Sequence, residues 1–217
     1  MRLAFFALFS YVLGSFPTAY LIGKWFKGID IRKVGSKNMG TVNTFKNVGP
    51  IAGVIVAIVD VSKGLIPAIL VGTLGFPKVA YPIAGAAVVA GHNWSIFMKF
   101  NGGQGLATAA GFLFALMPYE VLIAIALGAV GVVLLKMLGI GGWFKSPKNR
   151  FGFFTFSGLT CFIALRPHES FSRIAYLVIV VVLTIRQIEC ALKGWGYLRN
   201  TIVECLKGKK EAKKRDQ

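Results

Sequence analysis

Acidic residues are scarce in this sequence. Among 217 residues there are 8 Asp and Glu against 25 Lys and Arg, and only 15% of the residues are charged. A soluble domain keeps about a quarter of its residues charged, so this composition is not that of an ordinary soluble domain. The chain is also 55% hydrophobic. Few charges in a hydrophobic chain favour an integral membrane protein.

Cysteine motifs are lacking as well. The three cysteines, Cys161, Cys190 and Cys205, show neither metal-ligand nor redox spacing. No cluster of His, Cys and Glu suggests a metal, so we expect neither a metal nor another cofactor. The formal net charge of +17 comes without an aromatic-basic RNA signature or a DNA-reading motif, which argues against a nucleic-acid partner.

Three familiar catalytic motifs are missing too. There is no Gly-x-Ser-x-Gly nucleophile elbow and no Gly-Lys-Ser/Thr of a P-loop. Neither His92 nor His168 is followed by an Asp five positions later, so the His-x4-Asp pattern of acyl-CoA-dependent acyltransferases is absent. The usual soluble nucleophile arrangements are therefore excluded.

Long apolar runs are what the sequence does contain. They lie near 3–23, 51–76, 79–91, 105–117, 119–138, 152–165 and 174–187. A transmembrane helix needs about 20 mostly apolar residues, so these runs predict an all-α integral membrane protein of about seven transmembrane helices. The third and fourth runs are short, and five spans with two re-entrant pieces are the alternative. The first run is too long for a signal core, so we expect a retained helix.

Basic residues are distributed unevenly between the predicted loops. With residue 1 outside, the inward segments hold twenty Lys and Arg and the outward segments hold four; the inward segments are 24–50, 92–104, 136–151 and 186–217. Cytoplasmic loops collect Lys and Arg, so we expect the N-terminus outside and the C-terminus in the cytoplasm. The chain is expected to form one polytopic membrane domain, 1–217, with a basic tail at about 207–217 that touches anionic lipid.

The segment "GSKNMGTVNTFKNVG", residues 35–49, is a polar loop between two apolar runs. It combines glycines, hydroxyls, side-chain amides and lysines. Glycines let a backbone approach a ligand, and the other groups are the donors that an anion requires. A phosphate site and an unliganded basic cytoplasmic loop explain this composition about equally well.

A second polar loop, "GHNWSIFMKFNGGQGLATAAG", occupies residues 91–111. Its "GGQG" precedes an apolar helix expected from Leu106, and a helix N-terminus offers aligned N–H donors to an anion. Close helix packing explains the glycines equally well. His92 is either a base near a phosphate or a hydrogen-bonded structural residue.

Asp60 and Lys63 stand inside the second apolar run, in "VDVSKG". Their spacing of three places them on one helical face, where an ion pair can form. Ionisable groups within a span are costly and indicate function. The alternative is a pair that only locks two helices together.

These segments together resemble a known family. The stretch "LGSFPTAYLIGKWFKGIDIRKVGSKNMGTVNTFKNVG" resembles the first signature of the bacterial acyl-phosphate-dependent glycerol-3-phosphate acyltransferases. "DVSKG" and "GHNWSIFMKFNGGQGLATAAG" look like the next two signatures, in the expected order. The similarity is close from residue 13 to about residue 111, and beyond that it is limited to hydropathy.

The resemblance implies a seven-helix enzyme of the bacterial inner membrane whose active face is cytoplasmic. It would transfer an acyl group from acyl phosphate to the 1-hydroxyl of glycerol 3-phosphate, giving lysophosphatidic acid for phospholipid synthesis. His92 would be catalytic, with Asp60, Lys63 and Arg32 in support. The implied phosphate-binding residues are Ser36, Asn38, Gly40, Asn43, Lys46, Gly102, Gly103, Gln104, Gly105 and Thr108.

The chain departs from the family pattern at several positions. Lys37 stands where the family has Gly, Lys46 where it has Arg, and Gln104 where it has Lys. The third motif, a His-Arg-Glu-Asn run, is replaced by "TIRQIECALKG" (184–194) or "LRNTIVECLKG" (198–208). The alternative function is a catalytically impaired member that binds a phosphorylated lipid precursor or regulates a membrane partner.

Overall fold

The computed structural model describes residues 1–137, 170–190 and 192. The chain divides into two compact units, Met1–Leu183 and Thr184–Gln217. All of the described secondary structure is helical, as the composition predicts. The expected span at 152–165 and the basic tail at 207–217 lie outside the described residues.

The first apolar run forms two helices rather than one. Helix α1 covers Arg2–Ser15 and helix α2 covers Thr18–Lys27. Pro17, which has no backbone N–H to continue a helix, lies between them. Helix α2 ends at Gly28 in the left-handed conformation, with φ of 66°. The pair α1–α2 is still long and apolar enough to cross a membrane.

Most of the remaining helices follow the predicted apolar runs, but the short helix α3 lies within the segment 35–49, which was predicted to be a polar loop. Their bounds are α3 Thr41–Asn47, α4 Pro50–Thr73, α5 Ala80–Asn93, α6 Leu106–Leu116, α7 Pro118–Met137 and a last helix Ser170–Cys190. Short 3-10 turns occur at Ile31–Lys33 (η1) and Ile96–Met98 (η2). Helices α5 and α6 have 14 and 11 residues, so the third and fourth apolar runs are indeed short.

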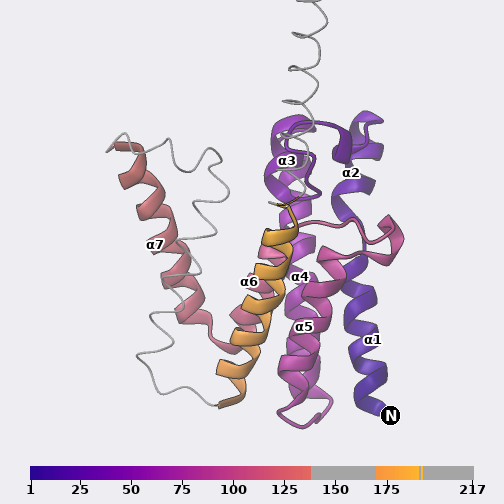
Figure 1. Ribbon diagram of the computed structural model, residues 1–217, viewed down its shortest axis with the longest axis vertical. Helices are drawn as coiled ribbons and strands as arrows, with labels where there is room; N and C mark the ends of the chain where they lie inside the picture. Colours follow the sequence, from indigo (N-terminus) through magenta and orange to yellow (C-terminus); the bar gives the residue numbers. More distant parts are fainter. Residues whose placement is uncertain (138–169, 191, 193–217) are drawn as a thin grey trace, which may run out of the picture. The chain divides into compact units, whose positions relative to one another are not determined.

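Two helix pairs pack closely through glycines. Helix α1 lies beside α5, and α4 lies beside α6 (Figure 1). Each helix of a pair carries a glycine that lies against a backbone carbonyl of the other helix, where a Cβ would collide. These glycines are Gly14 and Gly91 in the α1–α5 pair, and Gly64 and Gly111 in the α4–α6 pair. Small residues at such contacts let helices approach each other without hydrophobic side chains between them.

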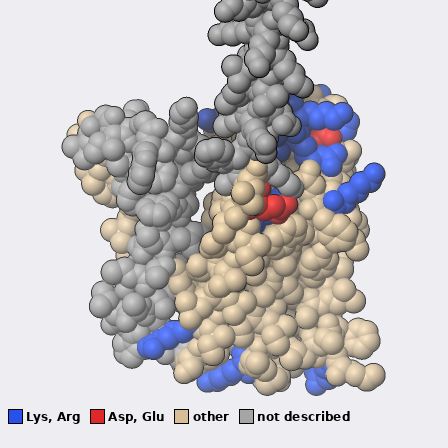
Figure 2. Space-filling view, viewed as in Figure 1, with Lys and Arg blue, Asp and Glu red and all other residues tan. Residues whose placement is uncertain are grey.

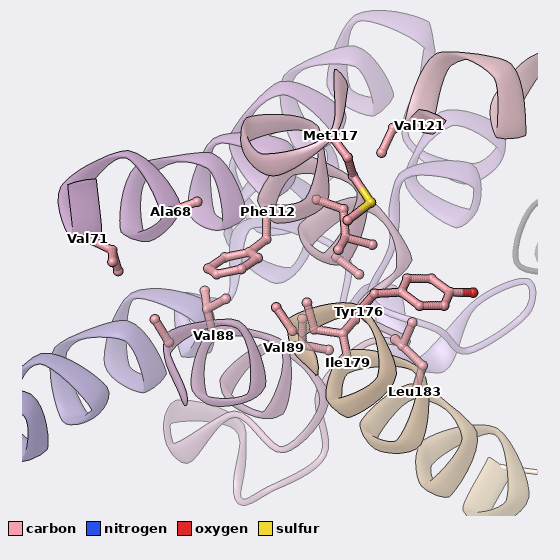
Figure 3. Packing of buried hydrophobic residues seen from close by; sticks show 14 of the residues in the cluster. Ala68, Val71, Val88, Val89, Phe112, Met117, Val121, Tyr176, Ile179 and Leu183 are labelled. Carbon is pink, nitrogen blue, oxygen red and sulfur yellow. The ribbon is translucent and has the colours of Figure 1, made fainter. Parts of the chain in front are cut away.

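The hydrophobic core lies between α4, α5, α6, the start of α7 and the last helix. Tyr176 and Phe112 are its largest fully buried side chains, and Val88 of α5 lies beside Phe112 (Figure 3). A smaller cluster around Ile31 and Val56 joins α2, η1 and α4. This second cluster fixes the two ends of the first polar loop to the helices that flank it.

Charged side chains gather at the ends of the helices, and the surface between them is mostly uncharged (Figure 2). Three helical segments are long and apolar enough to cross a membrane: Arg2–Lys27, Pro50–Thr73 and Ser170–Cys190. Many large apolar side chains are exposed along them, such as Ile58 at 61% and Leu177 at 58%. Lipid is the medium in which such a surface is stable.

Candidate active site

The first polar loop is organised around the side chain of Asn43. This residue is 2% exposed and lies in the short helix α3. Its Nδ2 donates to three backbone carbonyls, those of Ile31, Val34 and Asn38, at 3.0, 3.1 and 3.0 Å. Its Oδ1 accepts from the backbone N–H of Ser36 at 2.9 Å. The side-chain amide of Asn43 therefore links α3 to η1 and to the turn at residues 34–38.

The other predicted residues of the first loop lie around this centre. Gly40 is the N-terminal boundary of α3, and Lys46 is exposed in its last turn. Asn38 and Ser36 use their backbone groups to bond Asn43. Direct contact of these residues with phosphate stays a prediction. The structure adds that Asn43 holds the loop in shape.

Lys37 adopts a backbone conformation that favours glycine. Its φ is 56°, and Gly35 two positions earlier has the same value. The left-handed region is uncommon for residues with a side chain. The family's glycine at this position is therefore explained by the turn, which Lys37 follows despite its Cβ.

Arg32 is engaged by Asp30 rather than free for a ligand. Its Nη2 lies 2.7 Å from Asp30 Oδ2, and its Nε donates to Oδ1 at 3.0 Å. This hydrogen-bonded pairing lowers the pKa of Asp30 and raises the pKa of Arg32 from their ordinary values. The guanidinium also lies 5.1 Å from the centre of the Tyr20 ring. Arg32 thus supports the loop through η1.

The second polar loop returns to its starting point through two backbone hydrogen bonds. The N–H of Gly102 donates to the carbonyl of Asn93 at 3.1 Å, and the N–H of Gly103 donates to that of His92 at 3.0 Å. A Cβ on Gly103 would collide with His92 Nε2 and would lie 2.8 Å from the carbonyl of Met39. The two polar loops therefore meet at Gly103.

His92 stands at this meeting point. It is 8% exposed, and its Nδ1 lies 3.0 Å from Thr108 Oγ1 and 4.0 Å from Asp60 Oδ1. Thr108 is in the first turn of α6, which Gly105 begins with φ of 70°. The Nδ1 side of the ring thus faces the α4–α6 pair, and the Nε2 side faces Gly103.

Asp60 and Lys63 form a buried ion pair beside His92. The Nζ of Lys63 lies 2.7 Å from Asp60 Oδ1, and the two residues are 4% and 2% exposed. Lys63 also donates to the carbonyl oxygen of Phe16, in the break between α1 and α2, at 2.6 Å. The pair therefore links α4 to the break in the first span and lies beside His92; its role in catalysis stays a prediction.

These elements surround one narrow pocket with a volume of about 10 Å³. Of the predicted residues, His92, Gly103, Asp60 and Lys63 line it. The first loop contributes Met39, and the predicted donors Ser36, Asn38, Asn43 and Lys46 are not among the lining residues. Gln104 and Gly105 follow Gly103 directly in the chain.

Sequence reasoning missed three lining hydroxyls, those of Ser15, Thr18 and Ser95. Ser95 donates to the carbonyl of Ser15, and Thr18 begins α2. These residues are far from Lys63 along the chain, so no sequence spacing predicts that they line the same pocket as Lys63. Of the two candidates for the third motif, 184–194 continues the last helix to Cys190, and Arg186 pairs there with Glu189 at 2.7 Å. The other, 198–208, lies outside the described residues.

The sequence and the fold of this chain were compared with those of known proteins. The sequence model of the glycerol-3-phosphate acyltransferase family matches residues 4–194. The chain belongs to that family. "Glycerol-3-phosphate acyltransferase 5" of Dehalococcoides mccartyi is 41% identical over 135 residues, which is 62% of this chain and 58% of the relative. "Glycerol-3-phosphate acyltransferase 2" of Moorella thermoacetica is 41% identical over 132 residues, 61% of this chain and 68% of the relative.

Two crystal structures of PlsY (YgiH), an integral membrane glycerol 3-phosphate acyltransferase, share the fold. The glycerol 3-phosphate form aligns with a TM-score of 0.72 at 30% identity, covering 89% of this chain and 94% of that one. The lysophosphatidic acid form gives 0.71 at 29% identity. The match to the Dehalococcoides relative covers less than two thirds of that relative's length. The present chain is thus an all-helical membrane protein of the glycerol-3-phosphate acyltransferase family.

Proposed function

We propose that this protein transfers an acyl group from acyl phosphate to the 1-hydroxyl of glycerol 3-phosphate. The products are lysophosphatidic acid and inorganic phosphate. The observation that carries the proposal is the meeting of both polar loops with the buried Asp60–Lys63 pair at His92. Family membership supports it, as do the substrate and product named for the two PlsY structures.

In this reaction His92 acts as the general base. Its Nε2 side faces Gly103 and takes the proton of the 1-hydroxyl as that oxygen bonds to the acyl carbonyl carbon. The bond from this carbon to the phosphate oxygen then breaks, and phosphate leaves with the bonding electrons. Thr108 at Nδ1 orients the ring, and the Asp60 carboxylate 4.0 Å away stabilises the imidazolium. The anhydride is already activated, so no covalent nucleophile is needed.

The two polar loops bind the phosphate groups. Lys46 supplies an exposed positive charge at the first loop, and Ser36, Asn38 and Gly40 supply donors around it. In the second loop, Gly102, Gly103, Gln104 and Gly105 precede the N-terminus of α6, whose N–H groups favour an anion. Asn43 acts here by holding the first loop in its bound shape.

The active face is cytoplasmic, in the bacterial inner membrane. The segment 24–50, which contains the first loop, carries six of the basic residues, whereas the turn between α4 and α5 carries only Lys78. This asymmetry favours an outward N-terminus and an inward C-terminus. Seven transmembrane helices satisfy this orientation.

The test is a direct assay of the full-length protein in detergent or in vesicles. It is incubated with acyl phosphate and labelled glycerol 3-phosphate, and labelled lysophosphatidic acid is measured. Acyl-CoA replaces acyl phosphate in a parallel reaction and is expected to give no product. His92→Gln, which keeps a hydrogen-bonding side chain of similar length, is expected to lower kcat about 100-fold or more. Binding of glycerol 3-phosphate without product would instead indicate a non-catalytic family member.

A further inference from the structure

Lys63 reaches from the middle of α4 to the break in the first span. Its Nζ lies 2.6 Å from the carbonyl oxygen of Phe16 and 2.7 Å from Asp60 Oδ1. An ammonium group has three N–H donors, and these are its two hydrogen-bond acceptors among the described residues. Asp60 lies on the same helix and Phe16 in the break between α1 and α2, so one N–H of the ammonium group is left for a further acceptor.

Thr18 has a buried hydroxyl without a partner. The residue is 5% exposed, and its Oγ1 has no hydrogen bond to any residue that the structure describes. A buried hydroxyl in this state destabilises a protein, so such groups are rare and call for an explanation. The first residue of α2 could be apolar at no cost to the helix, because its hydroxyl caps nothing.

Thr18 and Lys63 line the same pocket. His92 and Gly103, where the two polar loops meet, line it too, as does Asp60, whose carboxylate pairs with Lys63. The pocket volume of about 10 Å³ corresponds to one water-sized group. It thus fits a single oxygen atom between a cationic donor, a hydroxyl donor and the ring of the general base.

We infer that Thr18 and Lys63 bind one anionic oxygen atom of the reacting substrates. This inference rests on the proposed acyl transfer. The oxygen belongs either to a substrate phosphate group or to the acyl carbonyl. In the second case the attack of the 1-hydroxyl moves the carbonyl π electrons onto this oxygen, and they return when the phosphate leaves. Donors aimed at such an oxyanion lower the barrier because they need no reorganisation.

The decisive variant is Thr18→Val, which has the same shape without the hydroxyl. Because this hydroxyl bonds no described group, its removal is expected to leave the melting temperature unchanged or raised. A fall in kcat of about 10- to 100-fold, with KM values unchanged, assigns the oxygen to the acyl oxyanion. A similar rise in KM for one substrate, with kcat unchanged, assigns it to that substrate's phosphate. Thr18→Ser, which keeps the hydroxyl, is expected to retain activity.

Two outcomes would overturn the inference. If Thr18→Val changes neither kcat nor either KM, the hydroxyl contacts no reacting group. If it lowers the melting temperature while the kinetic constants stay unchanged, the hydroxyl serves the fold, for example through a bound water. Lys63→Arg is the companion variant, since it keeps the charge opposite Asp60 but not the position of the donor, and is expected to lower kcat at a similar melting temperature.

Failure of the proposed reaction is detected separately. If the wild-type protein forms no lysophosphatidic acid, binding of glycerol 3-phosphate and of inorganic phosphate is measured by calorimetry. If Thr18→Val then binds glycerol 3-phosphate or phosphate about tenfold more weakly than the wild type, the oxygen site is supported and the proposed acyl transfer is rejected. An unchanged affinity, or no binding by either protein, rejects both.

Discussion

Asn43 is almost fully buried, and its amide is hydrogen-bonded on both sides within the first polar loop. The composition of the loop suggests a direct phosphate ligand at this position. The geometry gives it a supporting role, because the oxygen and the nitrogen of the amide already have protein partners. A buried amide with all partners present specifies one loop conformation, and a partly satisfied one would not.

We expect Asn43→Ala to lower stability and glycerol 3-phosphate affinity together. It leaves several buried backbone groups without partners, at a cost of about 2–4 kcal/mol. Thermal unfolding in detergent and equilibrium binding measure the two effects. Asn47→Ala is the matched control, since the Asn47 side chain only donates to Asn43. Weaker binding at unchanged stability would instead indicate direct contact of Asn43 with phosphate.

Lys37 offers a second test at the same scale. Its φ of 56° predicts that Lys37→Gly stabilises the protein by about 1 kcal/mol. Lys37→Ala removes the same charge but keeps a Cβ, so it should give no such gain. The comparison of the two melting temperatures separates backbone strain from charge. Equal melting temperatures would show that this conformation costs nothing here.

At the scale of helices, the α4–α6 contact positions Thr108, the hydrogen-bond partner of His92. Gly64 lies against the carbonyl of Thr108, and Thr108 bonds His92. The α4–α6 distance therefore sets where Thr108, which bonds the imidazole of α5, lies relative to Asp60 and Lys63. Helix α4 carries Asp60 and Lys63 as well, so one helix pair holds most of the charged groups of the site.

Gly64→Ala is expected to lower both stability and kcat. Its Cβ would collide with the backbone of α6, and moving packed helices apart costs about 1–3 kcal/mol. Gly72→Ala is the control on the same helix, because its Cβ would meet only the Tyr81 hydroxyl at 3.2 Å. An active, stable Gly64→Ala protein would contradict the close α4–α6 contact.

At the scale of the whole molecule, the charge asymmetry predicts which loops face the cytoplasm. In a variant whose three cysteines are replaced by Ser, a single cysteine is introduced at Lys33 or at Lys78. A membrane-impermeant thiol reagent is expected to label Lys78→Cys in intact spheroplasts, and Lys33→Cys only after the membrane is opened. Labelling of Lys33→Cys in intact spheroplasts would place the active face outside.

Several features of this protein were determined by its sequence alone. Apolar length predicted the helices at 50–73 and 118–137 closely, and the two polar segments picked out in the sequence, 35–49 and 91–111, meet at Gly103. These signals are local, because the length of an apolar run and the charges beside it do not depend on packing. The break at Pro17 was the main local feature that the apolar run concealed.

The tertiary structure decided the roles of the individual side chains. Lys63 finds an acceptor at Phe16, 47 positions away, and His92 of α5 lies within hydrogen-bond distance of Thr108 of α6, 16 positions later. Thr18 lies within the first signature stretch, but only the fold shows that its buried hydroxyl has no partner among the described residues and that it lines the same pocket as Lys63. Such relations depend on distances between helices, which are set by side-chain packing over the whole core and not by the spacing of residues along the chain.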